Sequence, residues 1–224
     1  MKTQKKMFVV LTALVLAMVC VLAFVACDKQ PEKDPDNKQD QETKLEYKTP
    51  TVAASEWEKK SISELKAMDL SGKKVVYQLT GTTVNAQGKA FGLMVNLYED
   101  GMVVTTQYTK GSPVTITYYG YWEKTDAPAI DVTQFGCVIT DAPESMAQLN
   151  DTEYGADKNC NTYNSFEIKD NAIVGSINFS VAPGHYGATN SMTVAQEGLT
   201  IKYADKTELR TAVEAIDETY KPAE

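Results

Sequence analysis

The sequence predicts a mainly β protein whose antiparallel meander closes into a β-barrel, with a two-sheet β-sandwich as the alternative. Between residues 74 and 203, apolar side chains recur at every second position, which is typical of half-buried strands. Most of the connections are short turns, and such turns join only antiparallel neighbours. One short helix is predicted before the meander and one amphipathic helix after it.

The N-terminal helix is predicted from Ser55 to about Met68. Ser55 and Glu58 have the spacing of a capping box, in which the two side chains satisfy backbone N–H groups of the first turn. The apolar stripe of this helix consists of Trp57, Ile62, Leu65 and Met68. Ser71 and Gly72 follow, and we expect the helix to end there.

Nine strands are expected in the meander, and the second is the clearest. Apolar residues occupy every second position of this strand and therefore share one face; they are Phe91, Leu93, Val95 and Leu97. Glu99, Asp100 and Gly101 then form a hairpin turn, because glycine accepts the positive φ that tight turns need. Polar loops at 141–163 and 182–190 interrupt the later part. The strands are expected within 74–84, 90–98, 102–109, 114–122, 129–140, 166–168, 173–181, 192–194 and 199–203.

The C-terminal helix is predicted from Thr207 to about Tyr220. Its apolar residues lie at spacings of four, three and four, and they are Leu209, Val213, Ile216 and Tyr220. This spacing places them on one face, so the helix is amphipathic.

The order of short helix, meander and amphipathic helix resembles a lipocalin-like barrel. The run from Leu93 to Gly101, followed by Tyr119-Gly120-Tyr121-Trp122-Glu123, is similar to lipocalin-like domains of bacterial lipoproteins. In lipocalins proper a Gly-x-Trp lies in the first barrel strand, whereas here Gly120 and Trp122 fall in the fourth. The resemblance implies an up-and-down barrel of about eight strands, which encloses enough space for one small ligand.

The first residues of the chain have the pattern of an export signal. Lys2, Lys5 and Lys6 precede an apolar run over residues 7–26, which ends at Cys27. The run from Leu22 to Cys27 resembles a bacterial lipobox, in which the cysteine is lipidated and becomes the mature N-terminus. We therefore predict a signal peptide over 1–26 and a lipid anchor on Cys27, with an uncleaved membrane anchor as the alternative.

The lipid anchor leads to a predicted organisation and location. Residues 27–50 are acidic, polar and almost without apolar side chains, so they are predicted to form a disordered linker. Residues 51–224 are the size of one domain with its own core. The protein is expected on the extracytoplasmic face of the cell membrane, with the membrane as a partner through its lipid.

The charge of the chain excludes one class of partner. The predicted signal peptide holds three of the 22 basic residues and none of the 30 acidic ones, so the remainder has a net charge of about −11. Nucleic acid is bound largely by basic residues that neutralise phosphates, so we expect no nucleic-acid partner. Like charge on the surface favours a soluble monomer.

The sequence offers few groups for catalysis. His185 is the only histidine and lies in a loop suited to tight turns. Neither a Gly-x-Ser-x-Gly nor a His-Glu-x-x-His motif occurs, and no cluster has the spacing of a catalytic zinc site. We therefore predict no enzymatic activity, no metal and no cofactor.

Two further features concern the loop over 141–163. Cys137 and Cys160 are candidates for a disulfide, because the envelope can be oxidising; the alternative is one buried and one exposed thiol. The loop also gathers oxygen ligands of the kind calcium takes, but without the spacing of an EF-hand, so a solvated loop is expected. These residues are Asp151, Glu153, Asp157, Asn159 and Asn161.

Aromatic side chains are the most suggestive functional feature. If Trp122 points into the barrel, alternation turns Tyr119 and Tyr121 outward, where they could contact sugar rings or a protein. His185 and Tyr186 are further candidates for such contacts. The leading prediction is a non-enzymatic module that binds a small apolar or amphipathic ligand at the open end of the barrel. The alternative is an interaction lipoprotein with a packed barrel, whose surface tyrosines contact glycan or an envelope protein.

Overall fold

The computed structural model describes residues 47–84, 88–126, 128–154, 162–169, 172–180, 189–197 and 200–218. The predicted signal peptide and Cys27 lie outside these ranges. Within them, no helix combines the length and apolar character needed to cross a membrane. Contacts with the barrel begin upstream of the predicted domain boundary at 51, because the backbone N–H of Lys48 donates to the Tyr77 hydroxyl over 2.7 Å.

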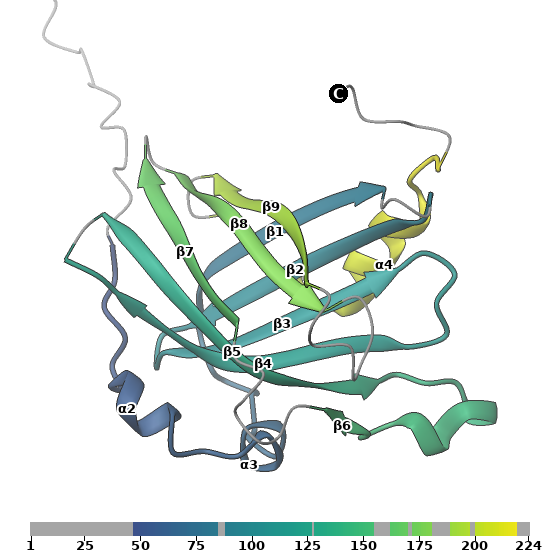
Figure 1. Ribbon diagram of the computed structural model, residues 1–224, viewed down its shortest axis with the longest axis horizontal. Helices are drawn as coiled ribbons and strands as arrows, with labels where there is room; N and C mark the ends of the chain where they lie inside the picture. The colour runs from purple at the N-terminus through teal and green to yellow at the C-terminus, as the bar shows by residue number, and fades with distance from the viewer. Residues whose placement is uncertain are drawn as a thin grey trace, which may run out of the picture. The chain divides into compact units, whose positions relative to one another are not determined.

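Eight antiparallel strands form a closed barrel, which confirms the predicted fold and excludes the sandwich (Figure 1). Sequential strands pair with one another, β5 pairs with β7, and β9 returns to pair with β1. A ninth, very short strand, β6 (Glu153–Tyr154), pairs with the edge of β5. The barrel strands are β1 (Val75–Val84), β2 (Ala90–Tyr98), β3 (Met102–Thr109), β4 (Thr115–Lys124), β5 (Ala129–Thr140), β7 (Thr162–Lys169), β8 (Ala172–Ser180) and β9 (Thr189–Glu197).

Among the described residues, the helices cover one side of the barrel. Strands β2, β3 and β4 are buried at nearly every position, because helices pack on their outer face. In β7 the buried and exposed residues alternate strictly, because solvent contacts its outer face. The helices visible in Figure 1 beside β2 to β5 are therefore part of the packing of this half of the barrel.

The single N-terminal helix predicted over 55–68 is wrong: two short helices occupy this region. They are α2 (Ala54–Trp57) and α3 (Ile62–Lys66). The capping box is formed by Ser61 and Glu64 at the start of α3, rather than by Ser55 and Glu58. The break between the helices lets Trp57 donate to the carbonyl of Asp100 over 3.0 Å while α3 packs against β4 and β5.

The C-terminal helix α4 (Lys206–Glu214) is shorter than predicted. The Asp205 side chain caps it by accepting from the backbone N–H groups of Thr207 and Glu208. Leu209 and Val213 bury the predicted apolar face against the outer side of β2 and β3. Tyr220 lies outside the described residues.

Two predictions for the later meander are wrong. Residues 200–203 form no strand; the side chain of Gln78, rather than a backbone carbonyl, accepts from the amides of Lys202 and Tyr203. The loop over 141–163 is not wholly irregular either. It contains a 3-10 helix, η1 (Glu144–Leu149), and the short strand β6.

Candidate binding site at the barrel seam

The barrel interior, as far as the structure describes it, is filled by large side chains. Trp122 is fully buried there, and its indole nitrogen donates to the carbonyl of Tyr98 over 2.7 Å. Other large interior side chains are as fully buried, and they are Tyr77, Leu79, Leu93, Leu97, Ile130, Phe166, Ile173 and Ile177. A ligand in the middle of the barrel would have to displace these side chains.

Some polar groups also face the interior. The hydroxyl of Tyr118 donates to the side-chain oxygen of Gln107 over 3.0 Å. Within the described residues, Gln134 Oε1 and Asn164 Nδ2 are buried without a hydrogen-bond partner, on the neighbouring strands β5 and β7. The interior is therefore not uniformly apolar.

The predicted tyrosine platform is wrong in its position. Tyr119 and Tyr121 do lie on the face opposite Trp122, but each is only 7% exposed. Both belong to the apolar cluster beneath α2 and α3, and the Tyr121 hydroxyl donates to Glu58 over 2.8 Å. The helices that cover β4 remove these rings from contact with a partner, and Trp122 is a core residue.

A different tyrosine is exposed. Tyr163, on the outer face of β7, is 59% exposed, and its hydroxyl donates to the carboxylate of Asp131 on the neighbouring strand β5. This hydrogen bond raises the pKa of Tyr163 to about 12, with smaller contributions from desolvation and from the charges of Asp131 and Glu123. The ring of Tyr163 is thus open to contact, while its hydroxyl is held by Asp131.

The remaining sequence-predicted candidates are only partly described. Cys137 is fully buried on β5, whereas Cys160 lies outside the described residues, so the disulfide stays a prediction. His185 and Tyr186 also lie outside them.

Two of the five candidate calcium ligands lie in described parts of the chain. Asp151 and Glu153 approach the ammonium group of Lys66 on α3, at 3.2 and 3.7 Å. Glu153 also accepts from the Ser63 hydroxyl at 3.0 Å. Among the described residues, no group of three or more histidine, cysteine or acidic side chains could hold a metal ion. Asp157, Asn159 and Asn161 lie outside the description.

A cavity occurs where the barrel closes, at the seam between β1 and β9. The pairing of these strands is short, with Thr80 opposite Ala195. Beyond that pair, the acceptor for the backbone N–H of Gln78 is a side chain and not the backbone of β9. Gln196 Oε1 accepts from this N–H over 2.9 Å. The ladder therefore ends early and β9 diverges from β1.

The side chain of Gln78 also binds the segment that follows β9, residues 200–203, on the outside of the barrel. Its Oε1 accepts from the backbone N–H groups of Lys202 and Tyr203, each over 2.8 Å. Its Nε2 donates to the carbonyl of Tyr203 over 2.8 Å and to Asn96 Oδ1 over 2.9 Å. Residues 200–203 are thereby held beside β1 without forming a strand.

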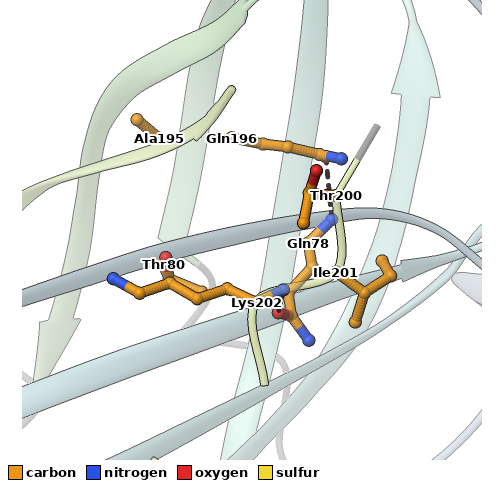
Figure 2. A pocket seen from close by; sticks show the side chains of 7 residues that line it. All are labelled: Gln78, Thr80, Ala195, Gln196, Thr200, Ile201 and Lys202. Carbon is orange, nitrogen blue, oxygen red and sulfur yellow. Dashed lines mark hydrogen bonds between the residues drawn. The ribbon is translucent and has the colours of Figure 1, made fainter. Parts of the chain in front are cut away.

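The space between this segment and the two strands is a cavity of about 630 Å³, which we call the seam pocket. Figure 2 shows its lining side chains, with the hydrogen bond between Gln196 and Gln78 at one side. The described lining residues are Gln78, Thr80, Ala195, Gln196, Thr200, Ile201 and Lys202. Lys202 is the one charged residue among them.

A residue that lines the pocket has an unsatisfied donor. Gln196 is 3% exposed, and its Nε2 has no hydrogen-bond partner among the described residues. A buried polar group without a partner costs roughly 1–3 kcal/mol, so such groups in native proteins call for an explanation. The seam pocket is thus a cavity of ligand size, and Gln196 in its lining has a buried donor that lacks an acceptor.

Sequence reasoning missed this site completely. No motif marks Gln78 or Gln196, and residues 199–203 resembled a strand because apolar positions alternate there. No protein-family model matches the chain, and neither the curated proteins nor the solved structures provide a match.

Proposed function

We propose that the protein is a non-enzymatic binding module of the bacterial cell envelope that takes a small ligand in the seam pocket. The unpartnered Nε2 of Gln196 beside a cavity of about 630 Å³ is the observation that carries this proposal. Ligand pockets typically measure about 300–1,000 Å³ and contain a few polar groups that orient the ligand. The packed middle of the barrel favours this site over the barrel interior.

The location is proposed from the export signal. Leu22 to Cys27 resembles a lipobox, and lipid on Cys27 would hold the protein on the extracytoplasmic face of the membrane. Several acyl chains on one cysteine anchor firmly, because each buried methylene contributes about 0.8 kcal/mol. Mass spectrometry of protein extracted from membranes is expected to find an acylated N-terminal Cys27. An internal, unmodified Cys27 would refute the anchor without affecting the pocket.

Native mass spectrometry of protein purified from its own host tests the binding function. Ala195→Trp places a large ring in the seam pocket, whereas Thr193→Trp places the same ring on an exposed position of the same strand face, away from the lining. We expect a small molecule to co-purify with the wild type and with Thr193→Trp, and to be lost from Ala195→Trp. A co-purifying molecule that all three retain would place the binding site elsewhere.

A second candidate function is contact with envelope glycan through Tyr163. The observation in its favour is the 59% exposure of a ring whose hydroxyl is held by Asp131. An exposed aromatic ring offers a flat apolar surface with a polar tip, which suits the face of a sugar. Retention on an insoluble polysaccharide is expected to fall in Tyr163→Ala and to persist in Tyr163→Phe, which keeps the ring. Equal retention of all three forms would remove this candidate.

A further inference from the structure

We propose that the seam pocket recognises a small carboxylate with an apolar chain, and that Gln196 Nε2 donates the hydrogen bond that selects it. This inference rests on the proposed binding function and names the ligand class of the same pocket. It follows from the orientation of the Gln196 amide and from the other groups that line the cavity.

The orientation of the Gln196 amide is fixed by its neighbour. The backbone N–H of Gln78 can only donate, so the atom of Gln196 that lies 2.9 Å from it must be the oxygen. The nitrogen therefore occupies the other position, and exchanging the two atoms would place two donors against each other. Figure 2 shows the amide nitrogen of Gln196 directed away from Gln78, on the side of Thr200.

This nitrogen has no acceptor among the described residues. Gln78 itself cannot supply one, because its Oε1 already accepts from two backbone N–H groups and its own Nε2 donates to two oxygens. A ligand oxygen placed on Gln196 Nε2 would satisfy the donor and offset the cost of its burial. The ligand must therefore present an acceptor rather than a donor at this point.

The lining of the pocket also favours a negative charge on the ligand. Lys202 carries the one charge among the described lining residues, and its side chain extends past Thr80 along the pocket (Figure 2). Its ammonium group lies 5.2 Å from the centroid of the Tyr203 ring. Hydroxyl groups of Thr80 and Thr200 can donate as well. Hydrogen bonds to a charged acceptor are roughly twice as strong as those between neutral groups.

One lining residue, Ile201, provides a surface for the apolar chain of the ligand. Ile201 is 41% exposed and lines the pocket, which makes it one of the three exposed large hydrophobic side chains within the described ranges. An apolar chain against this side chain would bury surface that is otherwise in water, at about 25 cal/mol per Å². A carboxylate head at Gln196 and a chain at Ile201 together match the chemistry of the pocket.

The test compares three six-carbon probes that differ only in the head group: hexanoate, hexan-1-ol and hexylammonium. Each is titrated into ¹⁵N-labelled protein, and the dissociation constant is read from the shifts of amides that line the pocket. For the wild type we expect hexanoate to bind about tenfold more tightly than either of the others, which corresponds to one charge-assisted hydrogen bond.

The variant Gln196→Glu is expected to reverse the preference for hexanoate. The substituted side chain keeps an oxygen for the backbone N–H of Gln78, but it replaces the donor by a negatively charged acceptor. We expect the variant to lose hexanoate binding by about tenfold and to prefer hexylammonium. A merely structural role of Gln196 would weaken all three probes together. Thr193→Trp, outside the pocket, is the matched control and should keep the wild-type preference.

The outcomes separate the ligand class from the binding function. If Ala195→Trp abolishes co-purification but the probes bind without preference to both the wild type and Gln196→Glu, the pocket stands and the carboxylate proposal is overturned. If Ala195→Trp retains the co-purifying molecule and no probe shifts the pocket amides, the proposed function fails as well. Preference for hexanoate that reverses in Gln196→Glu supports both.

Discussion

The ring of Trp122 meets the ring of Tyr77 edge-on inside the barrel, with centroids 5.7 Å apart and an interplanar angle of 80°. This is the favoured T-shaped arrangement of two aromatic rings. The indole nitrogen donates to Tyr98, and the Tyr77 hydroxyl accepts from the backbone N–H of Lys48. The two rings thus link β1 and β4 to each other, and Tyr77 also binds Lys48, which precedes the barrel in the chain.

Trp122→Ala is expected to lower the free energy of unfolding by about 3–5 kcal/mol, because it leaves a large cavity in a packed core. Trp122→Phe keeps an aromatic ring but loses the hydrogen bond to Tyr98. We therefore expect a smaller decrease in the free energy of unfolding, about 1 kcal/mol for the hydrogen bond and a further contribution from the looser packing of the smaller ring. Denaturant unfolding followed by circular dichroism measures both. Equal stability of the wild type and the alanine variant would contradict a filled interior.

Gln78→Leu is expected to release residues 202–203 from the barrel. It leaves the backbone N–H groups of Lys202 and Tyr203 without their acceptor. Hydrogen exchange at these two amides should accelerate by at least tenfold, and the free energy of unfolding should fall by about 2–3 kcal/mol. Thr200→Ala, an exposed substitution in the same segment, should change neither quantity. Unchanged exchange in the leucine variant would mean that Gln78 does not hold this segment.

Gly120→Ala is expected to disrupt the pairing of β4 with β5. A Cβ atom on Gly120 would lie 1.8 Å from the carbonyl oxygen of Thr133, because the register of the two strands shifts between Tyr118 and Gly120. The backbone must move to relieve this clash, so we expect a loss of at least about 3 kcal/mol in unfolding experiments. Gly111→Asn is the control, since a Cβ on Gly111 meets no atom within 4 Å and asparagine tolerates its φ of +72°. Comparable losses in the two variants would argue against a special role for Gly120.

Tyr163 is expected to ionise late although its ring is exposed. Its pKa is raised from 10.0 to about 12 by the hydrogen bond to Asp131. A group whose folded pKa is raised contributes its stabilisation below the unfolded value near 10 and loses it as the pH rises toward 12. Titration of ¹³C-tyrosine resonances should show this transition, and Asp131→Asn should return it toward 10. A Tyr163 pKa near 10 in the wild type would contradict the hydrogen bond.

Local sequence patterns predicted most of the barrel. The strands predicted within 90–98 and 129–140 correspond to β2 and β5, and Gly101 adopts the positive φ, 96°, that the hairpin turn required. Alternation also placed Tyr119 and Trp122 on opposite faces. It could not show that α2 and α3 cover the outer face, because that depends on contacts such as Trp57 with Asp100, far apart in the chain.

The errors arose where two local signals competed or where only distant residues decide. Ser55 with Glu58 and Ser61 with Glu64 have the same capping spacing, but Ser55 lies inside α2, whose N-cap is Ala53, whereas Ser61 is the N-cap of α3. The seam could not be predicted, because Gln78 binds residues 124 and 125 positions away through its side chain. Such a bond leaves no periodicity in the sequence.

A high-resolution structure of the protein purified from its own host tests the central claim most directly. We predict density for a small molecule in the seam pocket, with an oxygen at hydrogen-bond distance from Gln196 Nε2 and an apolar portion against Ile201. Density for a ligand among Trp122, Gln134 and Asn164 inside the barrel, with only solvent at the seam, would contradict it.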